Sequence, residues 1–220
     1  MGHKTHPTGF RIGFNKNWDS VWFADSRKEY IDKFFEDMEI TKYIMRRFFG
    51  AMVSKVEIKR KTDKLKIIIR TARPGIVIGR KGSEIEKLKQ EILTLLKMNS
   101  QDDYNKLIID VREIKRPQID AELIGQDIAR QLEGRISYRR AMKRSMFRAI
   151  ESGAEGIKIK ISGRLNGAEI ARTEEYHQGQ NPLQTLRANI DYALVEAKTK
   201  YGIIGIKIWV CNGELMQIQR

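Results

Sequence analysis

Polar and apolar residues follow two different periods in the first half of the chain. Apolar residues recur at helical spacing in 28–49 and again in 85–96. Polar and apolar residues alternate in 53–60 and apolar residues crowd 64–71, which predicts two strands joined by a polar turn. A third strand is predicted at 106–114. This half is therefore expected to combine helices with a small sheet.

Proline, glycine and serine indicate how the middle of the chain is divided. Pro74 suits the first turn of a short helix that ends at Gly79. Ser83 and Glu86 form a capping box at the start of the next helix, and a polar loop at 99–105 precedes the third strand. The predicted order is helix, strand, strand, helix, loop, helix, strand.

The second half begins after a linker, Lys115-Arg116-Pro117. Helices are predicted at 120–134, 138–152 and 193–200, and three or four strands include 157–162 and 204–210. Strict alternation, Ile-Lys-Ile-Lys-Ile-Ser, marks the strand at 157–162. Helices and strands that are grouped in this way predict an α+β fold.

Positive charge is concentrated in two segments. The net charge is +14 and the isoelectric point is near 9.8. Residues 51–100 carry 13 Lys/Arg and 5 Asp/Glu, and 134–148 carry 6 basic residues and no acid. These two excesses account for the whole net charge. Charge focused in this way predicts a polyanionic partner, either nucleic acid or an anionic membrane surface.

The sequence shows no sign of membrane insertion or secretion. No apolar run approaches the roughly 20 residues that span a bilayer, and the first residues lack the apolar segment of a signal peptide. A single cysteine, Cys211, excludes an internal disulfide and fits a reducing compartment. We therefore expect a cytoplasmic protein.

The segment Gly79-Arg80-Lys81-Gly82 is a Gly-x-x-Gly loop with two basic residues at its centre. Its glycines let the backbone turn tightly and approach a ligand closely. The helix that follows directs free N–H groups and the positive end of its dipole toward the loop. Because Arg80 and Lys81 add full charges, we expect a phosphate backbone as the ligand.

The glycine spacing argues against two nucleotide-binding motifs. A dinucleotide fingerprint needs Gly-x-Gly-x-x-Gly and a P-loop needs Gly-Lys-Ser/Thr, whereas this chain has Lys81-Gly82-Ser83. An ordinary turn between helices is the simple alternative. Within this order of elements, however, the loop resembles that of a KH domain of the second, prokaryotic type. The resemblance implies an αββααβ fold whose loop clamps single-stranded nucleic acid.

Basic residues cover one face of the helix predicted at 138–152. They follow one another at one-turn intervals and are Arg139, Arg140, Lys143, Arg144 and Arg148. A solvated helix surface is the alternative, but such surfaces usually mix both signs, whereas 134–148 contains no acid. We therefore expect polyanion binding here as well.

Motifs along nearly the whole chain resemble one family, that of the third protein of the bacterial small ribosomal subunit (ribosomal protein S-three). The opening segment Gly-His-Lys-Thr-His-Pro-Thr-Gly-Phe-Arg-Ile-Gly at 2–13 resembles the start of that family. The other matching stretches are 18–24, 71–79, 139–144, 162–173 and 201–205. They keep the same register from residue 2 to about 214.

This resemblance implies three domains. They are an extended RNA-binding arm at 1–24, a type II KH domain at 25–116 and the C-terminal ribosomal protein S-three domain at 117–220. The last is expected to be an α+β domain with two helices packed on a mostly antiparallel sheet.

The resemblance also implies a function without catalysis or cofactor. The chain would be a structural constituent of the small-subunit head that binds ribosomal RNA and lines the channel where messenger RNA enters. Arg139, Arg140, Lys143 and Arg144 would face incoming messenger and contribute to its unwinding. Implied neighbours are ribosomal proteins S-ten and S-fourteen, with S-two, S-four and S-five nearby. A free-standing KH-type RNA-binding regulator is the alternative function.

Five further residues are candidate contacts to ribosomal RNA: Lys4, His6, Arg11, Arg164 and Arg172. The first three lie in the arm, which lies against RNA in the family. Arg164 and Arg172 lie on a predicted hairpin rim, where a salt bridge to Glu169 or Glu174 is an equal alternative.

Other chemistry has weaker support in the sequence. His3 and His6 lack a complete set of metal ligands, and Cys211 with His177 has no motif for a nucleophile. We expect Cys211 and Trp209 to lie in the core. No catalytic or metal site is predicted.

Overall fold

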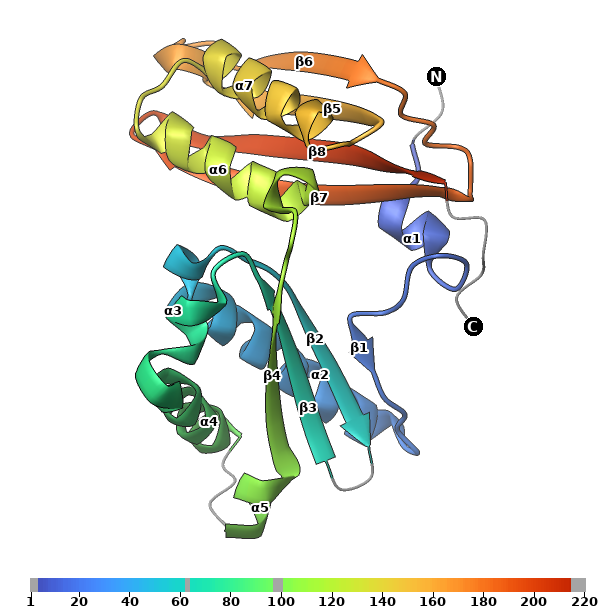
Figure 1. Ribbon diagram of the computed structural model, residues 1–220, viewed down its shortest axis with the longest axis vertical. Coiled ribbons are helices and arrows are strands. Elements are labelled where there is room, and N and C mark those ends of the chain that lie inside the picture. Colours follow the sequence, from blue (N-terminus) through green and yellow to red (C-terminus); the bar gives the residue numbers. More distant parts are fainter. Residues whose placement is uncertain (1–3, 62–63, 97–100, 215–220) are drawn as a thin grey trace. The chain divides into compact units, whose positions relative to one another are not determined.

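A computed structural model describes residues 4–61, 64–96 and 101–214, which form two compact units (Figure 1). One unit runs from Trp18 to Lys115, and the other joins the segment that ends at Asn17 to the chain from Arg116 onward. In the middle of the chain the units therefore divide between Lys115 and Arg116, within the predicted linker. None of the helices in the described ranges is long and apolar enough to cross a membrane.

The unit from Trp18 to Lys115 is built on a four-stranded mixed sheet. Its elements are β1 (Ser20–Val21), α2 (Arg27–Arg47), β2 (Val53–Lys61), β3 (Lys64–Thr71), α3 (Pro74–Ile78), α4 (Ser83–Leu95), α5 (Gln101–Lys106) and β4 (Leu107–Glu113). The strand order is β1-β2-β3-β4, and only β2 and β3 are antiparallel neighbours. From α2 to β4 these elements confirm the predicted type II KH order, with α5 as an additional turn of helix.

Helices α2 and α4 contribute to the core of this unit. Ile40 and Ile44 of α2, with Leu88 and Ile92 of α4, are fully buried against the inward side chains of β2 and β3. Their spacing of four residues places each pair on one helical face, which explains why both helices were recognisable in the sequence.

Two details of this unit differ from the prediction. The N-cap of α4 is Gly82 and has no side-chain hydrogen bond, so the predicted capping box of Ser83 and Glu86 is wrong. Ser83 lies one position too late, because the glycine loop itself supplies the turn into the helix. The predicted polar loop at 99–105 is partly helical, since α5 begins at Gln101; residues 99 and 100 lie outside the described residues.

The other unit is a sheet covered on one face by two helices. Its elements are α1 (Pro7–Arg11), α6 (Ala121–Glu133), α7 (Tyr138–Glu151), β5 (Gly156–Gly163), β6 (Arg172–Gly179), β7 (Ala188–Thr199) and β8 (Gly202–Glu214). The strand order is β6-β5-β8-β7, and all neighbours are antiparallel. Figure 1 shows α6 and α7 side by side on this sheet, as predicted.

The core of this unit lies between the two helices and one face of the sheet. Ile128 and Met142 from the helices meet Ile159 and Ile206 from β5 and β8, and all four are fully buried. Gly125 allows α6 to approach the sheet closely, because a Cβ atom there would lie 2.5 Å from a methyl group of Val195.

The segment 193–200 is a strand for most of its length, so the predicted helix is wrong. Ala193 and Ala197 are buried under α6, whereas Leu194 between them is 55% exposed, as the alternation of a strand requires. Alanine, glutamate and lysine favour helices in isolation, but pairing along the whole of β8 overrides that preference.

The predicted extended arm also differs from the structure. Pro7–Arg11 forms the short helix α1, which contacts β7 of the C-terminal unit. Residues from Trp18 onward belong to the other unit.

Candidate nucleic-acid interface

The glycine loop adopts a conformation that its sequence requires. Gly79 ends α3 with φ +72°, and Lys81 and Gly82 follow with φ +54° and +83°. A Cβ atom on Gly79 would lie 2.6 Å from Cγ of Glu84 and 3.0 Å from its backbone nitrogen. Glycine at this position therefore allows the loop to fold back onto the first turn of α4.

The cations of this loop face solvent. Arg80 and Lys81 are exposed, and neither forms an ion pair with any residue that the structure describes. Glu84 below the loop is occupied, because its carboxylate accepts hydrogen bonds from Lys87 and Arg47 at 3.0 and 3.1 Å. These bonds lower the pKa of Glu84. The loop thus presents two free positive charges at the start of a 13-residue helix.

Helix α7 separates apolar and basic residues onto opposite faces. Tyr138, Met142 and Met146 are buried against the sheet. The predicted messenger-facing residues Arg139, Arg140, Lys143 and Arg144 are all exposed. The first turn contains no acidic residue, so the positive end of the helix dipole adds to the same field.

Hydrogen bonds hold one of these cations in place. Nε of Arg139 donates to the hydroxyl oxygen of Tyr138 at 3.1 Å, and this hydroxyl lies 3.5 Å from a carboxylate oxygen of Glu174 in β6. The other three cations form no ion pair within the described ranges, whereas Arg148 lies 3.9 Å from Asp127. The charges of Arg140, Lys143 and Arg144 are therefore not paired by any residue of this unit that the structure describes.

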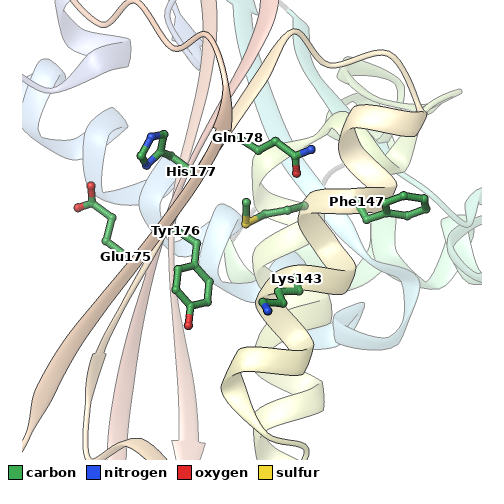
Figure 2. A pocket seen from close by; sticks show the side chains of 7 residues that line it. Lys143, Phe147, Glu175, Tyr176, His177 and Gln178 are labelled. Carbon is green, nitrogen blue, oxygen red and sulfur yellow. The ribbon is translucent and has the colours of Figure 1, made fainter.

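A shallow hollow lies between α7 and β6 beside these cations (Figure 2). Figure 2 shows Lys143 and Tyr176 facing each other across it, whereas Phe147 points away from the strand. Phe147 is 65% exposed and lies one helical turn beyond Lys143. The sequence analysis missed both aromatic residues, although the spacing of Phe147 from Lys143 placed it on the basic face.

The candidate residues of the arm fall into two groups. Lys4 and His6 are exposed at a groove on the sheet face that α6 and α7 leave open. Arg11 is fully buried instead, and its guanidinium donates to carbonyl oxygens of Pro7, Leu183, Thr185 and Ala188 at 2.8 to 3.0 Å. The structure thus gives Arg11 an internal role, in which its side chain is not available to RNA.

The two arginines of the hairpin rim also differ. Nε of Arg164 donates to the carbonyl of Ala168 at 2.9 Å, and its guanidinium lies 5.6 Å from the ring centre of Tyr201. It pairs with neither Glu169 nor Glu174 among the described residues. Arg172 is exposed at the start of β6.

The structure also describes most of the residues that were considered for catalysis or metal binding. Cys211 is 1% exposed, as predicted, and burial raises the pKa of its thiol. His3 lies outside the described residues, and His6 accepts a hydrogen bond from the backbone of Gly9 at 3.2 Å. Within the described ranges, no group of three or more His, Cys, Asp and Glu side chains is placed to hold a metal ion.

One further prediction was wrong. Trp209 lies on the open face of the sheet and is only half-buried, because it points away from the helices, as do Lys207 and Lys158. The alternation of the strands contained this information, since every second residue of 157–162 and 204–210 must face away from the core.

Comparison with known proteins matches both units to described families. Residues 39–119 match the KH domain family, and residues 128–210 match the family described as "Ribosomal protein S3, C-terminal domain". The KH match spans α3, the glycine loop and α4, and the second match spans the basic face of α7.

Relatives from two bacteria are similar to this chain over nearly their full length. The chain is 53% identical to the "Small ribosomal subunit protein uS3" of Lawsonia intracellularis, over 98% of this chain and 97% of that protein. It is 51% identical to the protein of the same name from Desulfovibrio desulfuricans, over the same shares. The chain therefore belongs to the uS3 family, whose members are RNA-binding structural proteins of the small ribosomal subunit.

Proposed function

We propose that the basic face of α7 lines the channel through which messenger RNA enters the small subunit. The observation that carries this proposal is the set of exposed cations Arg139, Arg140, Lys143 and Arg144 on one helix face, none of which forms an ion pair with a residue that the structure describes. An extended polyanion is the partner that such a surface favours.

The proposed contribution to unwinding needs no nucleotide hydrolysis by this chain. Cations that bind the phosphates of separated strands lower the free energy of the open form relative to the paired form. Translocation of the ribosome would supply the work. Phe147 and Tyr176, beside Lys143, add aromatic surface on which an unpaired base can stack.

We assign the loop Gly79-Arg80-Lys81-Gly82 to ribosomal RNA, together with Lys4, His6 and Arg172. Arg11 stabilises the C-terminal unit through hydrogen bonds to backbone carbonyls, and the half-buried Arg164 is retained as a proposed RNA contact. The specific neighbours we propose are ribosomal proteins S-ten and S-fourteen, with S-two, S-four and S-five nearby, in cytoplasmic ribosomes.

The test is to replace Arg139, Arg140 and Lys143 together with alanine and to measure elongation in reconstituted translation. We expect about fivefold slower movement through a stable messenger hairpin, which corresponds to about 1 kcal/mol, and little change on an unstructured message. Equal slowing on both messages would contradict the proposal.

A matched control removes the same charge elsewhere. Lys28, Lys42 and Lys59 are exposed in the KH unit and outside the glycine loop, and replacing all three with alanine should leave the ratio of the two elongation rates unchanged. A ratio that changes equally in this variant would show that net charge alone is responsible.

A further inference from the structure

The face of the C-terminal sheet opposite α6 and α7 carries aligned rows of side chains. In one row Lys158 of β5 pairs with Trp209 of β8, which pairs with Tyr192 of β7. In the next row Lys160 pairs with Lys207. Residues two positions apart on a strand are separated by about 7 Å, so the aromatic and basic rows lie side by side.

The pairing of Lys160 with Lys207 places two like charges opposite each other, and Glu175 on the other side of Lys160 offsets them only in part. Like charges directly opposite on neighbouring strands destabilise a sheet. Glu175 also pairs with Lys160 in register, but its carboxylate forms its ion pair with Lys158 at 2.5 Å. Neither Lys160 nor Lys207 forms an ion pair with any described residue, so their charge is available to an external anion.

The arm converts this flat face into a groove. The segment at Lys4 to Pro7 and Phe10 borders a concavity with Lys160, Lys207, Tyr192 and Trp209 on the strands. The imidazole of His6 meets the ring of Tyr192 edge to face, with centroids 4.8 Å apart, and the rings of Tyr192 and Trp209 are 5.3 Å apart. The groove therefore contains a row of aromatic rings that ends at Lys158, and beside it the lysine pair Lys160 and Lys207.

The charge of the groove also favours an anion. Four lysines (Lys4, Lys158, Lys160 and Lys207) surround the single carboxylate of Glu175, whose pKa is lowered mainly by its hydrogen bond with Lys158. A protein partner fits poorly, because lysine is depleted from the cores of protein interfaces. Aromatic rings beside a row of cations are the combination that binds single-stranded nucleic acid.

We propose that this groove binds single-stranded RNA, with phosphates on Lys4, Lys160 and Lys207 and bases against Tyr192 and Trp209. The site is separate from the basic face of α7, which lies on the helix side of the same sheet. It depends on the RNA-binding role of the family but not on the proposed contact with messenger.

The decisive test uses intact small subunits that contain this chain and 4-thiouridine-substituted RNA. After irradiation, mass spectrometry should find uridine adducts on peptides with Tyr192 or with Lys207 and Trp209. Absence of such adducts would overturn the proposal. Amine crosslinks from Lys160 or Lys207 to another ribosomal protein, without uridine adducts, would show that a protein occupies the groove and would also overturn it.

Charge reversal in the isolated chain provides a second measurement. Lys160→Glu with Lys207→Glu should weaken binding of a labelled oligouridylate of about 12 nucleotides by roughly tenfold, and should reduce the slope of log K against log salt by about one unit. The control is Arg130→Glu with Lys200→Glu, two exposed cations of the same unit that lie outside the groove.

Equal losses in the two double variants would overturn the proposal, because they would reduce it to an effect of net charge. Circular dichroism and urea unfolding of each variant establish that both remain folded. If the variant with Lys160→Glu and Lys207→Glu loses this binding while ribosomes that contain it pass messenger hairpins at the normal rate, the groove acts independently of the basic face of α7.

Discussion

At the scale of single residues, Gly79 is the glycine of the loop at which an added side chain would have the least room. Its φ of +72° and the nearby backbone nitrogen of Glu84 both oppose any larger residue. We expect Gly79→Ala to destabilise the KH unit by about 1–3 kcal/mol and to weaken RNA binding, since the loop must move to admit the methyl group. Urea unfolding and oligonucleotide titration measure the two effects.

Gly75 provides the matched control for this substitution. It lies in α3, and a Cβ atom there would have no heavy-atom neighbour within 4 Å. Gly75→Ala should leave stability unchanged or raise it by up to about 1 kcal/mol, because alanine favours helices. The explanation fails if both alanine variants unfold at the same urea concentration.

At the scale of elements, the first turn of α6 contains an acid whose pKa is raised by burial. Burial raises the pKa of Glu122 from its ordinary 4.5 to about 7, and Asp120 and Asp191 add to the effect. The helix dipole would favour an anion in this turn, but loss of hydration outweighs it. The folded chain thus binds this proton more tightly than the unfolded chain does.

The free energy of unfolding should consequently fall as the pH rises from about 4.5 to 7. Between about pH 4.5 and 7 the unfolded chain loses the proton first, so ionisation favours unfolding. We expect Glu122→Gln to be more stable than the parent by up to about 3 kcal/mol at pH 8 and nearly equal at pH 4. Gln126, which donates to Glu122 at 3.1 Å, can still donate to the amide oxygen.

Urea unfolding at the two pH values measures this difference. A stability gain of the same size at pH 4 and pH 8 would contradict the assignment, because it would show that the substitution acts through packing rather than through ionisation.

At the scale of the whole molecule, Arg11 joins the start of the chain to strands that lie more than 170 residues later. Its buried guanidinium donates to carbonyls on both sides of the contact, including Ala188 at 2.8 Å. Burial lowers the pKa of Arg11, but the group keeps its charge at neutral pH. The four carbonyl oxygens take the place of water around it.

We expect Arg11→Lys to destabilise the C-terminal unit by about 2 to 4 kcal/mol, because an ammonium group cannot reach these carbonyls together. Lys4→Ala, an exposed change in the same segment, should leave stability unchanged. Thermal unfolding monitors both variants. An Arg11→Lys chain as stable as the parent would show that the arm contributes little to the unit.

Local patterns in the sequence were sufficient for much of the fold. The helical spacing of Ile44 and Phe48, and of Leu88 and Ile92, identified two KH helices, and the glycine loop identified the turn between α3 and α4. The basic face of α7 was also predictable, because a helix repeats every 3.6 residues whatever it packs against. In these cases the interactions that determine the local structure act between residues that are close in the sequence.

Only the tertiary structure decided the roles of residues whose partners are distant. Most of the segment 193–200 is a strand because β8 pairs with it. Arg11 is buried because its guanidinium donates to backbone carbonyls that include that of Ala188. Alternation along each strand already placed Trp209, Lys160 and Lys207 away from the core, but only the strand register showed that the two lysines are direct neighbours in the row next to Trp209. By itself, the sequence determined the family, the KH order of elements and the two concentrations of charge. Strand pairing and burial, which depend on contacts between distant segments, decided which charges remain free for RNA.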